Sequence, residues 1–161
     1  MKSSPTRERQ IARLEEAVEL LGVATRALGE QSFLSRHGGW SPRDILAHLI
    51  GWNPAIVDGC RQLLRGELPF YDVDPGDDYC KVNAQFVRQH ASTSREGLLA
   101  DLGSSAARLG RFLEALDPVD WDRDSGVSHE GEQLTIRDTV DELIDDYRHH
   151  SEQIRGWEPR G

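Results

Sequence analysis

Three side chains in this sequence have the types and the spacing to hold one metal ion: His48, Asp146 and His150. Asp146 and His150 are four residues apart, so on a helix they project from the same edge about one turn apart. A third ligand from a facing helix completes a triangle and leaves coordination positions open for water or substrate. Two imidazoles and a carboxylate suit zinc, nickel or iron(II), and such donors do not choose sharply among these metals.

The same spacing also fits an interpretation without a metal. An aspartate four residues before a histidine is common as a surface pair on a helix. A histidine beside an apolar face is more often a hydrogen-bonded border residue than a ligand. Spacing alone therefore leaves a metal site and a pair of hydrogen-bonded histidines both open.

These three side chains can meet only if the helices that carry them face one another. The sequence predicts four long helices. Apolar residues recur three or four positions apart in the following segments: 5–29, 41–66, 93–117 and 135–156. His48 borders the apolar face of the second segment, and His150 falls on the inner side of the fourth, whereas His149 points away from it. Four amphipathic helices without a confident strand predict an all-α four-helix bundle.

An extra short helix and two long loops complete the predicted fold. The helix covers residues 79–90, and the loops cover residues 67–78 and 117–133. Loops of this length are usually functional or disordered, and here we expect them to roof one end of the bundle. The aspartates of the first loop lack the regular spacing of a calcium site and are expected to be solvated. Residues 1–161 are expected to form one domain.

Charge and hydropathy narrow the expected partners. A net charge of −9 repels a phosphate backbone, and the arginines form no basic patch, so we expect that nucleic acid is not a partner. No stretch approaches the roughly 20 apolar residues that cross a bilayer, and residues 1–8 are polar, unlike a secretion signal. We therefore expect a cytoplasmic protein with a small-molecule substrate and no membrane partner. Cys60 and Cys80 lack a zinc-binding spacing and are interpreted as free thiols, Cys60 as a core residue.

Two segments resemble a known family. Residues 39–52, GWSPRDILAHLIGW, resemble the helix-two signature of the DinB-like (DinB/YfiT) superfamily, and residues 145–154, DDYRHHSEQI, resemble its last-helix signature. The resemblance implies a four-helix bundle, often a homodimer, with a divalent metal held by three histidines. It places the ligands at His48, Asp146 and His150. Asp146 departs from the pattern, since the family usually has histidine there, and this implies either a changed metal preference or a degraded site.

The resemblance also implies a chemistry. Relatives in this family include thiol-dependent transferases and isomerases that use glutathione, mycothiol or bacillithiol. The leading hypothesis is therefore a metal-dependent transferase, isomerase or hydrolase in which a metal-bound thiol or a metal-bound water acts on a small electrophile. A low-molecular-weight thiol is the expected co-substrate in the first case, and the sequence does not assign catalytic residues. Two alternatives stay open: a non-catalytic bundle that sequesters a small compound in detoxification or stress response, and a bundle that only mediates dimerisation.

Overall fold

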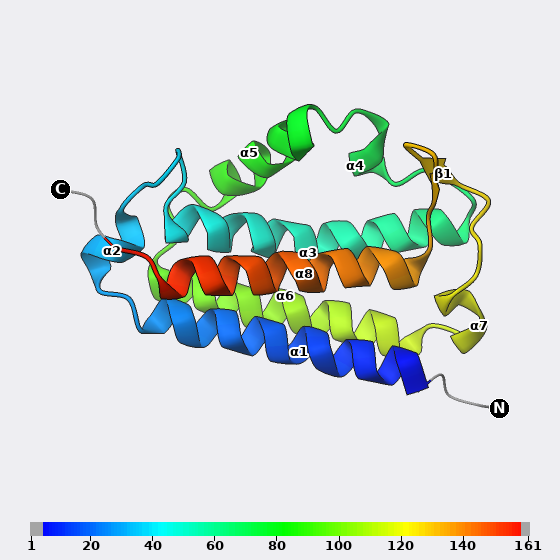
Figure 1. Ribbon diagram of the computed structural model, residues 1–161, viewed down its shortest axis with the longest axis horizontal. Helices are drawn as coiled ribbons and strands as arrows, with labels where there is room; N and C mark the ends of the chain where they lie inside the picture. Colours follow the sequence, from blue (N-terminus) through cyan, green and yellow to red (C-terminus); the bar gives the residue numbers. More distant parts are fainter. Residues whose placement is uncertain (1–4, 159–161) are drawn as a thin grey trace.

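Four long helices form a bundle, as the sequence predicts (Figure 1). The computed structural model describes residues 5–158; residues 1–4 and 159–161, which the sequence analysis assigns to the same domain, lie outside that range. The long helices are α1 (Pro5–Arg26), α3 (Pro42–Leu64), α6 (Arg95–Ala115) and α8 (Ile136–Arg155). Helix α1 packs against α6 and α8, and α3 packs against the same two helices. Helices α3 and α8 are therefore neighbours, which the predicted site requires.

Side-chain caps define where three of these helices begin. The Ser41 hydroxyl accepts a hydrogen bond from the Asp44 backbone N–H at 3.2 Å, and the Asp44 carboxylate accepts one from the Ser41 backbone N–H at 3.1 Å. Ser94 caps α6 and Thr135 caps α8, each accepting from the backbone N–H three residues later. Each cap satisfies a helix N–H that has no partner within the helix. The helices that carry the candidate ligands therefore start at residues that the sequence predicts.

The core lies between the inner faces of the long helices and consists mainly of leucine and isoleucine side chains. Leu21, Leu49 and Ile144, from three of the helices, are fully buried. Cys60 belongs to the same core, and burial raises the pKa of its thiol to about 12. Its interpretation as a core residue is confirmed, and Cys60 and Cys80 are both free thiols.

Two linked side-chain hydrogen bonds cross this core. The Tyr147 hydroxyl donates to Asn53 Oδ1 at 2.8 Å, and Asn53 Nδ2 donates to the Ser105 hydroxyl at 2.9 Å. Tyr147 and Asn53 are fully buried. These hydrogen bonds link α8 to α3 and α3 to α6. A buried polar group that loses its partner destabilises the fold by about 1–3 kcal/mol. The two hydrogen bonds therefore favour one rotation of α3, α6 and α8 about their own axes.

Short elements fill the connections between the long helices. They are α2 (Glu30–Leu34), α4 (Phe70–Val73), the 3₁₀ turn η1 (Asp77–Tyr79), α5 (Cys80–Gln89), α7 (Pro118–Trp121), β1 (Ser128–His129) and β2 (Glu132–Gln133). Helix α5 is the predicted short helix, whereas the segments expected to be loops hold α4, η1, α7 and an antiparallel hairpin of β1 and β2. Elements of two to five residues are too short to leave a periodic pattern in the sequence. Within residues 5–158, no helix is both long and apolar enough to span a bilayer.

Two glycines inside α3 allow α4 and α5 to lie close along that helix (Figure 1). A Cβ atom at Gly51 would lie 2.5 Å from the Cβ atom of Phe86 on α5, and one at Gly59 would lie 2.5 Å from the Tyr71 hydroxyl on α4. Glycine costs helix stability, about 0.5–1 kcal/mol relative to alanine. Here the missing side chains make room for two aromatic rings, so α4 and α5 form a roof over α3.

We predict that Gly51→Ala lowers the free energy of unfolding by about 1–3 kcal/mol, because α5 must shift to admit the new methyl group. Gly103→Ala is the matched control, since Gly103 also lies inside a long helix and nothing lies within 4 Å of its added Cβ. It should stabilise the protein by about 0.5–1 kcal/mol. Urea denaturation measures both. Equal effects of the two substitutions would contradict the close contact between α3 and α5.

Candidate metal centre

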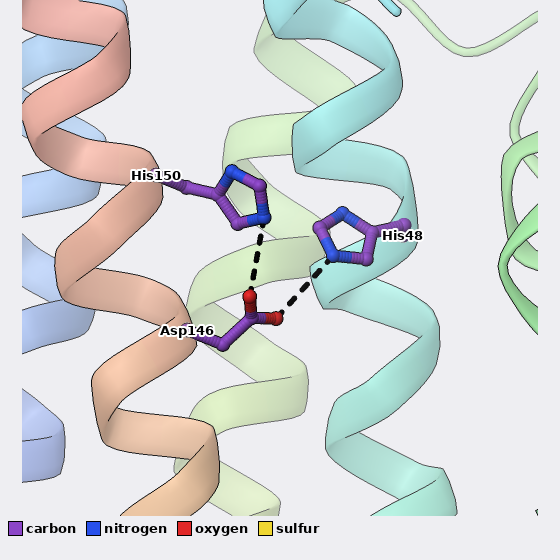
Figure 2. A group of neighbouring side chains, drawn as sticks. All are labelled: His48, Asp146 and His150. Atoms are coloured by element: carbon purple, nitrogen blue, oxygen red, sulfur yellow. Dashed lines mark ion pairs between the residues drawn. The ribbon is translucent and has the colours of Figure 1, made fainter. Parts of the chain in front are cut away.

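His48, Asp146 and His150 converge on one point between α3 and α8 (Figure 2). His48 Nε2 lies 3.4 Å from one carboxylate oxygen of Asp146, and His150 Nε2 lies 3.2 Å from the other. One donor atom from each residue lies within 4.8 Å of the other two. The structure thus brings together the three residues that the sequence singles out, while their role as metal ligands stays a prediction.

The outer nitrogen of each imidazole is held by a hydrogen bond. His48 Nδ1 lies 2.6 Å from the backbone oxygen of Ile45, one turn earlier on α3, and His150 Nδ1 lies 2.9 Å from the side-chain oxygen of Gln153. Both partners are acceptors as placed, so both Nδ1 atoms carry a hydrogen. Such bonds orient metal-binding histidines and leave Nε2 as the ligand atom. Both rings therefore present Nε2 to Asp146.

Burial and charge act on the three groups in different directions. Burial lowers the pKa of His48, and Asp146 offsets this only in part. Burial also works against the charged form of His150, but the hydrogen bond and charge of Asp146 outweigh it and raise the pKa of His150. Burial alone would raise the pKa of Asp146, yet the two imidazoles lower it far below its usual range. The carboxylate is therefore ionised and ready to bind a cation.

The donor geometry fits a divalent ion. With its hydrogen on Nδ1, a neutral His48 turns the lone pair of Nε2 toward a carboxylate oxygen 3.4 Å away. Two acceptors that face each other need a proton or a cation between them. Ligand atoms that share one tetrahedral zinc lie about 3.3 Å apart. The two contacts of Asp146 have about this length but end on different carboxylate oxygens, and one ligand atom from each residue lies within 4.8 Å of the other two. Nitrogen and carboxylate donors of this kind also accept nickel and iron(II).

One side of the triad faces a cavity of about 700 Å³. The cavity lies between α3, α8, the roof and the β1–β2 hairpin, and its lining combines aromatic, acidic and a few aliphatic side chains. Trp40 and Trp52 contact the core on one side and line the cavity on the other. The Trp40 ring lies 4.7 Å from the His48 ring, centroid to centroid. The triad is thus shielded by a tryptophan and open toward a space large enough for a small molecule.

The structure adds site residues that the sequence analysis misses. Asp72, expected to be solvated with the other aspartates of its segment, is only 7% exposed and lines the cavity beside Tyr71 and Tyr79. Asp72 belongs to the roof itself and is buried by contacts with residues outside α4, among them Tyr79 and His129, so no pattern within its own segment indicates its burial. The helix-interior glycines Gly51 and Gly59 are the signal that could have found the roof, since such glycines often mark close contact with another element.

Three further histidine and tryptophan residues lie outside the triad. His149 is exposed beside His150, as predicted. Trp121 is fully buried, and its indole N–H donates to Gln10 Oε1 at 2.7 Å, so it anchors the connection between α6 and α8. His129 lies outside the triad, with Nδ1 3.8 Å from Asp72 Oδ1.

Comparison with known proteins agrees with this fold. The sequence profile of the DinB superfamily matches residues 6–154. Among solved structures, the colibactin self-resistance protein ClbS, crystallised in complex with double-stranded DNA, is 17% identical with a TM-score of 0.75, and the match covers 98% of this chain and 96% of ClbS. An uncharacterised protein from Escherichia coli UTI89 is 16% identical with a TM-score of 0.71, over 96% and 93% of the two chains. No curated protein matches the chain in sequence.

The partners expected from the sequence need a correction, because the exclusion of nucleic acid is wrong. ClbS, which shares this fold, was crystallised in complex with double-stranded DNA. A net charge is an average over all faces of a molecule, and it does not report the charge of one face. The acidity of this chain is therefore no ground for excluding nucleic acid.

We predict that the affinity for zinc weakens as the pH falls. Asp146 raises the pKa of His150 in the metal-free protein, so protonation of His150 favours the metal-free fold below the unfolded pKa. This stabilisation of the metal-free fold is lost as the pH rises through the raised pKa that His150 has in the folded protein. Deprotonation then frees His150 Nε2 to bind zinc. The apparent Kd, measured by competition with a chromophoric chelator, should rise at least about tenfold between about pH 8 and pH 6. A Kd that stays constant over this range would rule out ligation by His150.

Proposed function

The chain belongs to the DinB superfamily, and we propose that it is a metal-dependent enzyme in which His48, Asp146 and His150 hold one divalent ion. One observation carries the proposal. The two Nε2 atoms and the carboxylate converge, each imidazole is oriented by a hydrogen bond on Nδ1, and the triad opens on a cavity. A structural cluster of polar residues needs no such opening, whereas a catalytic metal site does.

The proposed reaction is a transfer or isomerisation that acts on a small electrophile, with a low-molecular-weight thiol as co-substrate. The thiol chemistry follows from the family, and the cavity of about 700 Å³ supports it because it has room for a small substrate. A bound zinc, nickel or iron(II) ion supplies Lewis-acid chemistry, which polarises a substrate oxygen and lowers the pKa of a thiol.

Residues of the chain itself supply binding and proton transfer in this proposal. Glu142 lies one turn before Asp146 on α8 and also lines the cavity. Burial raises the pKa of Glu142, and the neighbouring Asp72, Asp138 and Asp145 raise it further. A carboxyl group with a raised pKa exchanges protons closer to neutral pH. We therefore assign Glu142 to proton transfer and the aromatic side chains of the cavity to binding the substrate.

A second candidate function is sequestration of a small compound without turnover. The observation that favours it is the size and aromatic lining of the cavity, which do not depend on a metal. ClbS, whose fold is similar, is a self-resistance protein, and a protective role is compatible with binding alone. The two candidates differ in whether the triad holds a metal.

Metal analysis of protein purified without a histidine tag tests the proposal. We predict about one equivalent of divalent metal per chain after growth in metal-replete medium, and loss of most of it in His48→Ala and in His150→Ala. Asp146→His restores the three-histidine pattern and should retain the metal. Mass spectrometry of the elements measures the metal content of each variant.

His149→Ala is the control, because His149 is the neighbour of His150 on α8 but is exposed and outside the triad. It should keep the full metal content. A protein without metal, or one that keeps its metal in His48→Ala, would refute the enzymatic proposal and favour sequestration. Circular dichroism of each variant shows that the helical fold is retained.

A further inference from the structure

Away from the triad, three neighbouring aromatic rings and one buried carboxylate form part of the cavity wall. The Trp52 ring lies 5.0 Å from the Tyr71 ring and 5.7 Å from the Tyr79 ring, and the two tyrosine rings lie 6.5 Å apart, centroid to centroid. Asp72 follows Tyr71 on α4 and is 7% exposed. All four side chains belong to the lining of the cavity.

One oxygen of the Asp72 carboxylate is free to bind a ligand. The Tyr79 hydroxyl donates to Oδ1 at 2.7 Å, and His129 Nδ1 lies 3.8 Å from the same oxygen. Among residues 5–158, no hydrogen bond reaches Oδ2. Oδ2 is not one of the buried side-chain atoms that lack a partner, so it is accessible from the cavity that Asp72 lines. Because Asp72 lines the cavity, a ligand in the cavity can supply the missing donor.

The backbone holds the aromatic rings in place. Asp78 and Tyr79 both have left-handed backbone angles, with φ of 48° and 65°, a conformation that costs a non-glycine residue about 1 kcal/mol or more. The Trp52 indole N–H donates to Asn83 Oδ1 on α5 at 2.7 Å. The three rings, which come from α3, α4 and η1, therefore lie against one another along one wall of the cavity.

The charge of the cavity favours a cation. Eight acidic side chains line it, and within the described part of the chain no lysine or arginine does. The neighbouring carboxylates raise the pKa of Glu142 beyond the effect of burial, which shows how closely the negative charges crowd. Aromatic faces attract cations as well, because the face of each ring is electron-rich.

We propose that the substrate carries an organic ammonium group, which pairs with Asp72 Oδ2 and packs against the rings of Trp52, Tyr71 and Tyr79. This inference rests on the proposed function in that it names the substrate class of the same cavity. An amine in this position brings the rest of the molecule into the cavity on which the triad opens.

Isothermal titration calorimetry with two probes of similar shape tests this inference: 2-phenylethylammonium and the neutral 2-phenylethanol. The ammonium should bind at least about tenfold more tightly than the alcohol, through the ion pair and the cation–π contacts. Asp72→Asn should remove this preference. Asp77→Asn should keep it, because Asp77 is an exposed aspartate of the same segment that does not line the cavity.

The same titration in the His48→Ala background excludes coordination of the probe amine to a metal, and the preference for ammonium should persist there. If the unaltered protein binds the two probes with equal affinity, or does not bind the ammonium, the inference is overturned. This test does not depend on whether Asp72→Asn folds. A preference that survives Asp72→Asn in a folded protein overturns it as well. The metal proposal is tested separately by the metal content of the protein, and it fails if His48→Ala leaves that content unchanged.

Discussion

The hydrogen bond from the Tyr147 hydroxyl to Asn53 constrains how α8 is rotated against α3. Both residues are fully buried, so another rotation would leave a polar group without a partner in the core. Asp146 and His150 lie on the same side of Tyr147 around the helix, because 3.6 residues make one turn. The rotation that satisfies Tyr147 therefore also turns Asp146 and His150 toward His48. The geometry of the site is a consequence of the core beside it.

Several residues in the roof of the cavity and on the helix below it have backbone conformations or burial that are unfavourable for their residue types. Gly51 and Gly59 lie inside a long helix, Asp78 and Tyr79 adopt left-handed backbone angles, and Asp72 is a buried carboxylate. Each of these features costs stability, and each one places or admits a side chain at the cavity or at its roof. Such costs persist where the surrounding structure enforces them, and they are typical of functional sites. The roof therefore resembles a binding wall more than an incidental connection.

The sequence predicts the parts of this structure that have a local signal. Helical periodicity predicts the long helices, and the spacing of Asp146 and His150 predicts that they share an edge. The burial of Asp72 and the arrangement of the tyrosines arise from contacts between segments far apart in the chain, so no local pattern reveals them. The exclusion of nucleic acid failed for a related reason, since a whole-chain charge says nothing about a particular face.

The most direct test of the account is an anomalous diffraction experiment at the zinc absorption edge, on crystals of untagged protein loaded with zinc. The account predicts one strong anomalous peak between α3 and α8, at bonding distance from the Nε2 atoms of His48 and His150 and from the Asp146 carboxylate, about 2.0–2.2 Å. A map without a peak at this point, or with peaks only at exposed carboxylates, would contradict it.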